Sequence, residues 1–156
     1  MKSLLTFPKG GVHPPDKKEQ TAGLAIEVMP VPDELEIILG QHIGAPCRLT
    51  VSKRDTVTEG TLIGEVRRGL GVPLHSPVAG KIKATGMSVH PIRVSSPSVT
   101  IAVDHEAPVP EYTRRDWSVL SADELLEKVH AAGIIGIGGA GFPTHVKLKS
   151  PPTTKI

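Results

Sequence analysis

The 156-residue chain has a single cysteine, few aromatic residues and no long apolar run. Cys47 alone cannot form an internal disulfide or hold an iron–sulfur cluster, because such clusters normally take several thiolates. Aromatic residues make up only 3% of the chain, so a hydrophobic core has to consist of Val, Ile and Leu. No segment approaches the roughly 20 apolar residues that span a bilayer. The sequence therefore predicts no direct membrane span, and Cys47 is expected to be a small buried hydrophobe.

The chain also lacks an excess of charge of one sign. Its 18 Lys and Arg nearly balance its 16 Asp and Glu, and the two kinds are interspersed. This pattern gives no electrostatic footprint for nucleic acid, so we expect no nucleic-acid partner. The seven histidines are scattered, without the spacing of a metal site. We therefore expect no metal site, and we expect His42 and His75 to orient turns through hydrogen bonds.

Glycine and proline, by contrast, are abundant, with 16 Gly and 15 Pro. Between residues 30 and 105 they separate short runs of alternating or compact β-branched residues, a pattern typical of strands. Spacing of this order favours a small sandwich or barrel. The expected strands cover residues 35–39, 47–51, 62–66, 81–85, 92–94 and 99–103.

The segments on either side of this β-rich region have different character. Residues 1–29 are rich in Pro and Gly and predict an extended arm, with a flexible tail as the alternative. Residues 106–120 have the composition of a linker, and Trp117 is expected to pack against a neighbouring domain. Ser121 and Glu124 form a capping box that begins a helix, and Gly133 is a natural stop for it. We therefore divide the chain at 1–29, 30–105, 106–120 and 121–156.

Four glycines, Gly136, Gly138, Gly139 and Gly141, fall within six residues just before Phe142-Pro143-Thr144. Glycines permit positive φ and close approach to a ligand, and a loop that leads into a helix presents N–H groups suited to phosphate. Lys147 would add a positive charge. A purely structural turn is the alternative, and we favour the binding interpretation. Because only twelve residues follow Thr144, too few to complete a nucleotide site, we interpret the chain as the front part of a longer protein.

Three motifs occur in an order that resembles one known family. Gly-Gly-Val-His-Pro-Pro occupies residues 10–15, Gln-His-Ile-Gly occupies 41–44, and the glycine-rich run occupies 136–144. Residues 55–60 and 75–82 resemble the biotinyl/lipoyl-type barrel-sandwich hybrid. The glycine-rich run is similar to the flavin-binding loop of the NADH-binding 51-kDa subunit of respiratory complex I. Together the motifs resemble the RnfC family, whose members belong to the Rnf electron-transport complex.

The resemblance implies a mainly β fold, with an N-terminal arm at 1–29, a barrel-sandwich hybrid at 30–105, a linker, and the truncated start of an α/β FMN/NADH-binding domain at 121–156. It implies that the intact subunit passes electrons from NADH through FMN to two [4Fe–4S] clusters beyond the C-terminus of this chain. Its partners would be the other Rnf subunits, at the cytoplasmic face of the inner membrane. Gly136, Gly138, Gly139, Gly141 and Lys147 match the cofactor-binding positions, whereas Ile137 replaces an arginine of complex I.

For the chain by itself, the resemblance implies a docking role, no catalytic residue and no bound cofactor. A swinging biotin or lipoyl arm is rejected, because the expected hairpin tip at residues 67–71 offers Arg67 and Arg68 in place of the lysine that acylation needs. Two alternatives remain open. One is an interaction module without chemistry, and the other is a soluble RnfC-like, NADH-dependent flavoprotein that feeds electrons to another reductase.

Overall fold

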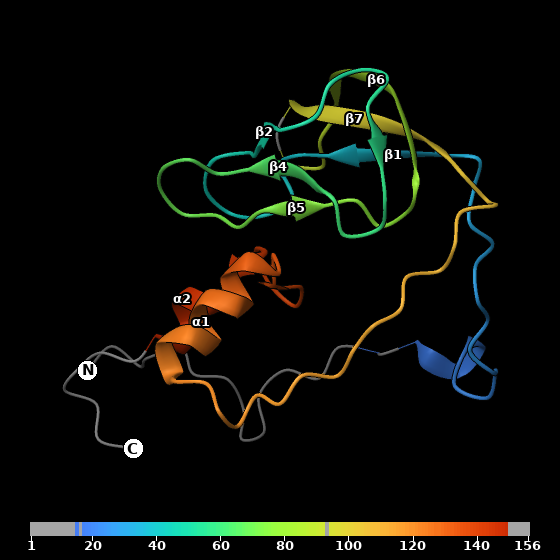
Figure 1. Ribbon diagram of the computed structural model, residues 1–156. Helices are drawn as coiled ribbons and strands as arrows, with labels where there is room; N and C mark the ends of the chain where they lie inside the picture. Colours follow the sequence, from blue (N-terminus) through green and yellow to red (C-terminus); the bar gives the residue numbers. More distant parts are fainter. Residues whose placement is uncertain (1–14, 16, 93, 150–156) are drawn as a thin grey trace, which may run out of the picture. The chain divides into compact units, whose positions relative to one another are not determined.

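The computed structural model describes residues 15, 17–92 and 94–149 (Figure 1). The chain forms two compact units, Met1–Val31 and Pro32–Ile156. In the described part of the first unit, a single turn of 3-10 helix, η1, covers Lys18–Gln20. Most of the motif at residues 10–15 lies outside the described residues. The predicted arm at 1–29 therefore stays a prediction.

The second unit begins with a curled antiparallel sheet of four strands. These are β1 (Glu34–Ile38), β3 (Thr56–Val57), β6 (Gly80–Val89) and β7 (Ser95–Val103), arranged in the order β1-β7-β6-β3. The long β6 and β7 pair from Gly80 opposite Val103 to Val89 opposite Ser95, with one irregularity between Ile82 and Ala84. Strand β1, which lies far away in sequence, pairs with the other edge of β7.

A second sheet has three short strands and faces the first across the hydrophobic core. Its strands are β2 (Arg48–Leu49), β4 (Leu62–Glu65) and β5 (Leu74–His75), in the order β2-β4-β5. The buried core cluster consists of Val and Ile side chains from both sheets, namely Ile37, Val57, Ile63, Ile82, Val99 and Ile101. Each such side chain contributes about 1.5–3 kcal/mol when it is fully buried. The two sheets together, residues 33–105, are called the β module below.

One predicted strand is wrong. Residues 92–94 lie in the bend between β6 and β7, where Ile92 is 89% exposed and Val94 is 96% exposed. Both residues are β-branched, but no second layer covers them, and Pro91 cannot donate a ladder hydrogen bond. Conversely, β3 and β5 span only two residues each, too few for a period-two pattern to reveal them.

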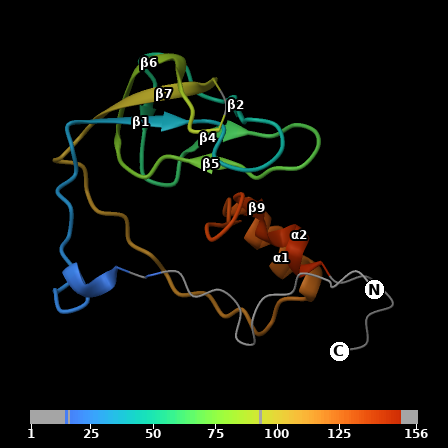
Figure 2. The ribbon, with the colours of Figure 1, turned by 180° about the vertical axis from the view of Figure 1, so that it is seen from behind.

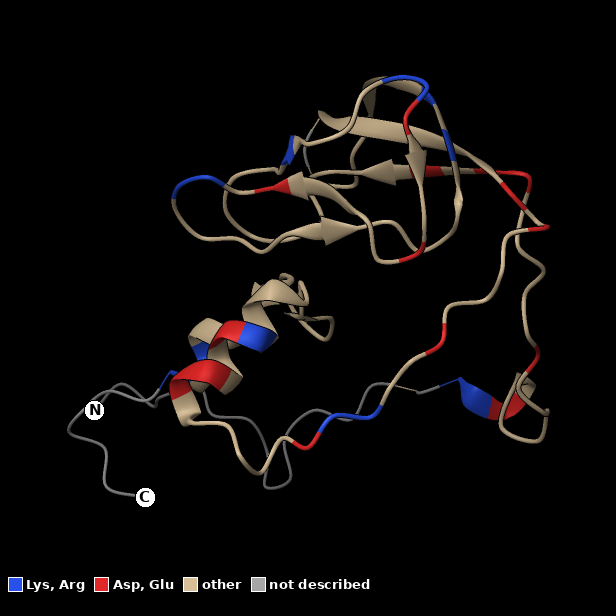
Figure 3. Cartoon of the chain, in the orientation of Figure 1, with Lys and Arg blue, Asp and Glu red and all other residues tan. Residues whose placement is uncertain are grey.

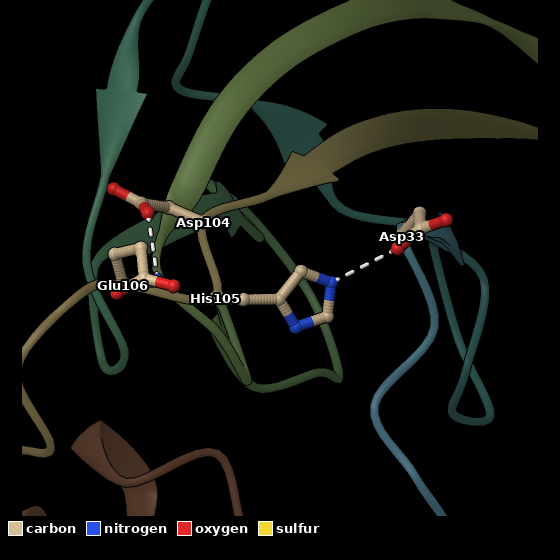
Figure 4. A network of polar contacts seen from close by, with 4 residues as sticks. All are labelled: Asp33, Asp104, His105 and Glu106. Atoms are coloured by element: carbon tan, nitrogen blue, oxygen red, sulfur yellow. Dashed lines mark hydrogen bonds and ion pairs between the residues drawn. The ribbon is translucent and has the colours of Figure 1, made fainter.

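The chain enters and leaves the β module at neighbouring points, which Figure 4 shows from close by. The Val103 amide donates to the Asp33 carbonyl at 2.8 Å, and His105 Nε2 lies 3.1 Å from Asp33 Oδ1. Beside this contact, the Glu106 amide donates to Asp104 Oδ1 at 3.1 Å. The Asp33–His105 pair is solvent-exposed, so it contributes little stability by itself and mainly marks where the two segments meet.

A small helical segment follows the module. Helix α1 (Ala122–Ala131) begins at the predicted capping box, in which Ser121 Oγ accepts from the Glu124 amide and Glu124 accepts from the Ser121 amide. It ends before Gly133, whose φ of 72° is the left-handed conformation expected at that position. The short helix α2 (Thr144–Leu148) packs beside α1 in both views (Figures 1 and 2).

The segment between the β module and α1 has no regular element over residues 104–120. Trp117 within it is 67% exposed. The prediction that this side chain packs against a neighbouring domain is therefore wrong within this chain. An exposed indole still carries a large apolar surface that a partner could cover.

Candidate anion-binding hairpin and its support

The glycine-rich run forms a small β-hairpin. Strands β8 (Ile135–Gly136) and β9 (Phe142–Pro143) pair antiparallel, with Ile135 opposite Pro143 and Gly136 opposite Phe142. Residues 135–143 are called the glycine hairpin below. At its tip, a Cβ added to Gly138 or Gly139 would meet no atom within 4 Å. The backbone of the tip is therefore open to the close approach of a ligand.

The glycine hairpin differs from its prediction in two respects. Of the four glycines in the run, only Gly141 has a positive φ, at 64°. In addition, α2 has only five residues, and the Thr144 amide at its start already donates to the Ile134 carbonyl at 3.0 Å. A helix of this length adds little dipole. Any anion would therefore be held by the hairpin backbone and a side-chain charge, not by a helix terminus.

Lys147 supplies such a charge at the base of the hairpin. Its Nζ lies 5.8 Å from the centre of the Phe142 ring, within reach of a cation–π contact. The same Nζ would be 2.6 Å from a Cβ on Gly136. The absence of a side chain at Gly136 therefore makes room for the Lys147 ammonium group. The structure brings these two predicted residues together, although they lie on different elements.

Gly141 faces the β module. A Cβ at this position would lie 2.8 Å from the Gln41 carbonyl oxygen and 3.1 Å from His42 Cα. The Ile43 amide donates to the Gly141 carbonyl at 3.4 Å. The predicted set thus divides by position: Gly138 and Gly139 at the open tip, Gly136 beside Lys147, and Gly141 against the module.

A cleft of about 700 Å³ lies between the β module and the glycine hairpin. His90 shapes one wall, since its Nε2 donates to the Gly40 carbonyl at 2.7 Å while its Nδ1 accepts from the Ile92 amide. On the same wall, Glu36 accepts from the Ser88 and Ser98 hydroxyls, which lower the pKa of its carboxyl group. A carboxylate there repels anions, so the open tip suits phosphate better than the cleft does. The lining residues are Glu36, Ile38, 40–43, 90–92, Ile135, Ile137 and 139–141.

His42 organises the part of the module that contacts the hairpin. It is 5% exposed, its Nε2 accepts from the Val72 amide at 3.4 Å, and its Nδ1 lies 3.0 Å from the Ile43 carbonyl. The Cys47 thiol donates to the Val72 carbonyl at 3.2 Å and lies 3.6 Å from His42 Nε2. The prediction that His42 orients a turn is confirmed, and so is the burial of Cys47, at 2% exposure. Burial raises the pKa of the Cys47 thiol to about 11.

A second histidine contact was not anticipated from the sequence. The rings of His130 on α1 and His145 on α2 meet edge to face, with centroids 4.3 Å apart. His145 Nδ1 is buried and has no hydrogen-bond partner among the described residues. Burial, followed by the nearby His130, lowers the pKa of His145. The two histidines are 15 positions apart, which no helical or metal-ligand spacing would single out.

Within residues 15, 17–92 and 94–149, no three His, Cys, Asp or Glu residues gather into a group that could hold a metal ion. None of the helices that the structure describes has the length and apolarity to cross a membrane.

Comparison with protein families decides the relationship of the chain. A family model described as the RnfC barrel sandwich hybrid domain matches residues 5–106, more than half of the sequence. The chain belongs to the RnfC family. The curled sheets of the β module are therefore the RnfC barrel-sandwich hybrid, as the resemblance implied.

Three relatives, each the C subunit of its complex, extend this match along the RnfC chain. The chain is 39% identical over 155 residues to that of the proton-translocating ferredoxin:NAD(+) oxidoreductase complex of Clostridium ljungdahlii, covering 98% of the chain and 34% of the relative. It is 40% identical over 148 residues to that of the ion-translocating oxidoreductase complex of Serratia proteamaculans, covering 90% and 20%. It is 40% identical over 153 residues to that of the Na(+)-translocating ferredoxin:NAD(+) oxidoreductase complex of Acetobacterium woodii, covering 95% and 34%.

The RnfC chain thus spans between a fifth and a third of the length of these relatives. The first match takes in nearly the whole chain and so includes the glycine hairpin, which lies beyond the range of the family model.

Proposed function

We propose that the chain acts as part of the electron-transfer subunit of an Rnf-type NADH:ferredoxin oxidoreductase. In this proposal the β module docks onto other subunits of the complex at the cytoplasmic face of the membrane. The glycine hairpin opens an α/β domain that binds FMN and NADH. The names of the relatives support this assignment, since two of them are subunits of ferredoxin:NAD(+) oxidoreductase complexes.

The observation that carries the cofactor part of the proposal is the open tip of the glycine hairpin beside a lysine. No side chain or backbone atom would meet a Cβ at Gly138 or Gly139, so a phosphate can approach the main-chain amides there. Lys147 lies at the hairpin base with its ammonium group beside Gly136. Gly141 shapes the hairpin through its contact with the β module.

These features fit a flavin phosphate or the diphosphate of NADH. When bound, FMN supplies the chemistry of accepting a hydride and releasing electrons singly. The residues of this chain would orient the phosphate and neutralise its charge. The proposed cofactor-binding set is Gly136, Gly138, Gly139, Gly141 and Lys147.

Iron–sulfur clusters, in contrast, do not fit the residues of this chain. Cys47 is its one cysteine, and the thiol is buried between His42 and Val72. A [4Fe–4S] cluster normally needs four thiolates. We therefore assign no cluster and no electron-transfer step to this chain, and any clusters of the intact protein would belong to other sequence.

Lys147→Met tests the cofactor part in a subunit of the full length of the relatives. Loss of one charge-assisted hydrogen bond, about 1.5–3 kcal/mol, should weaken FMN binding by about tenfold or more. Lys149→Met removes a nearby exposed charge and serves as the matched control. Flavin content after purification and fluorescence quenching by FMN are the measurements. Full flavin occupancy in the Lys147→Met variant would show that this lysine does not hold the cofactor.

The docking part of the proposal rests on an exposed apolar tip on the β6–β7 hairpin. Met87, Val89, Ile92 and Val94 are 62%, 83%, 89% and 96% exposed. Exposed apolar groups gathered in this way mark interaction surfaces. Basic and acidic residues are scattered over the strands and loops (Figure 3), so no face of one charge sign competes as the docking surface. The occupant we propose is another subunit of the complex, because the relatives are themselves named as subunits of complexes.

Ile92→Asp tests docking in cells that assemble the complex. Placing a carboxylate on the apolar tip should reduce co-purification of this subunit with the other subunits, without loss of the β module fold. Val109→Asp changes a residue that is 86% exposed but lies outside the module, and it serves as the control. Equal co-purification of both variants would remove this tip from the interface. If the tip docks while FMN binding fails in every form, the interaction module without chemistry becomes the better description.

A further inference from the structure

The glycine hairpin and the β module meet at one small contact. Gly141 is buried, and its positive φ turns its carbonyl toward the Ile43 amide, 3.4 Å away. The space for a side chain at Gly141 is filled by the Gln41 carbonyl oxygen and His42 Cα. The backbone of residues 41–43 is thus the surface on which the hairpin rests.

That backbone is held from inside the module by His42. Because Val72 N–H donates to Nε2, the proton of the neutral ring is on Nδ1, from which it reaches the Ile43 carbonyl. The same short stretch of backbone therefore contacts the His42 ring on one side and Gly141 on the other. The imidazole is almost fully buried, so no water can replace these bonds without opening the module.

We infer that the β module sets the position of the glycine hairpin, and that His42 is the positioning residue that does so through the backbone of residues 41–43. The module is then more than a docking surface. Its consequence for FMN rests on the proposed function, because a displaced hairpin matters for a cofactor only if the hairpin binds one. Positioning itself does not depend on any ligand.

The test changes one side of the contact and observes the other side in the 156-residue chain, free of ligand. In His42→Ala, the amide NMR signals of Gly138, Gly139 and Gly141 should shift, although these residues lie about a hundred positions away in sequence. In Gly141→Ala, exchange of the Ile43 amide hydrogen should accelerate by about tenfold, as expected for the loss of one buried hydrogen bond. A role confined to overall stability would leave the glycine signals in place under conditions where the core is folded.

His105→Ala is the matched control, because His105 contacts Asp33 at the exposed ends of the module and touches neither His42 nor the hairpin in Figure 4. Its glycine signals should equal those of the unchanged chain. If His42→Ala does not fold, Gly141→Ala carries the test alone, since it removes no core side chain. Unchanged glycine signals in a folded His42→Ala chain, or an unchanged Ile43 exchange rate in Gly141→Ala, would overturn the inference.

The double variant and the flavin measurement separate this inference from the proposed function. If both changes break the same contact, the effect of the double variant on hairpin signals should not exceed the larger single effect. In a subunit of full length, His42→Ala should also lower the flavin content. Shifted glycine signals with unchanged flavin content would support positioning and count against the cofactor role of the hairpin. Additive effects of the two changes would count against a shared contact.

Discussion

Gly80 is the position at which the packing of the β module can be tested most directly. It begins β6 and lies between two strands, with Val57 of β3 on one side and Val103 of β7 on the other. A Cβ at Gly80 would lie 2.2 Å from the Ala102 carbonyl oxygen and 2.8 Å from Ile101 Cγ2. The carbonyl belongs to a paired strand, so the backbone itself would have to move. Gly80→Ala is therefore expected to destabilise the module.

The size of the effect follows from two opposing terms. Forcing extra volume into a packed region costs about 1–3 kcal/mol, and occasionally more. Replacing glycine by alanine in a strand returns about 0.5–1 kcal/mol through the lower entropy of the unfolded chain. We therefore expect a net loss of about 1–2 kcal/mol in the free energy of unfolding. With an m-value of about 1–3 kcal/mol/M, the urea midpoint should fall by roughly 0.5–1 M.

Gly86 provides a control within the same strand. A Cβ there would meet nothing within 4 Å, so Gly86→Ala should leave stability unchanged or raise it by up to about 1 kcal/mol. Urea unfolding of both variants, followed by far-ultraviolet circular dichroism, measures the difference. Equal midpoints for Gly80→Ala and Gly86→Ala would refute the close-contact reasoning.

Three further predictions concern other parts of the chain. Cys47, with its pKa raised to about 11, should react with a thiol reagent at pH about 8 roughly 100-fold more slowly than in the urea-unfolded chain, and equal rates would contradict its burial. Ser121→Ala removes the cap of α1 and should cost about 1 kcal/mol, seen as faster amide exchange in the first turn; unchanged exchange would show that the capping box is dispensable. His145 has a lowered pKa, so below its unfolded value of 6.5 the unfolded chain binds the proton more readily than the folded chain. The free energy of unfolding should therefore fall as the pH drops from about 7.5 to below 6.5. His145→Phe should flatten that dependence in urea titrations, and an equal slope in both proteins would remove this histidine as its source.

The parts of the fold that could be predicted from sequence are those determined by local pattern. The expected strands at 35–39, 62–66 and 99–103 overlap β1, β4 and β7, because each carries β-branched residues that face one core. The position of helix α1 was predicted correctly because a capping box and a terminal glycine act within a few residues. The strand expected at 92–94 failed for the opposite reason. Apolar residues there are exposed at a turn, and composition alone does not distinguish burial from exposure.

The candidate site could be located from composition but not arranged. Four glycines in six residues singled out the hairpin, yet nothing local indicates that Gly141 rests on the β module while Gly138 is open to solvent. His42 was expected to orient a turn, but its link to the hairpin depends on contacts across about a hundred residues. Likewise, the His130–His145 pair forms only because two helices pack together. Such contacts belong to tertiary structure, which a pattern in the sequence does not determine.

The paired ends of the β module also bear on how a protein of this kind can be assembled from parts. Asp33 and Val103 are joined by a backbone hydrogen bond, so the chain arrives and departs at a single edge of the module. A domain with adjacent ends can be inserted into a longer polypeptide without stretching whatever precedes or follows it. The neighbouring stretch, residues 104–120, has no regular element to maintain. Its length is therefore free to vary, and the same compact cassette could serve proteins that hold it at different distances from the next domain.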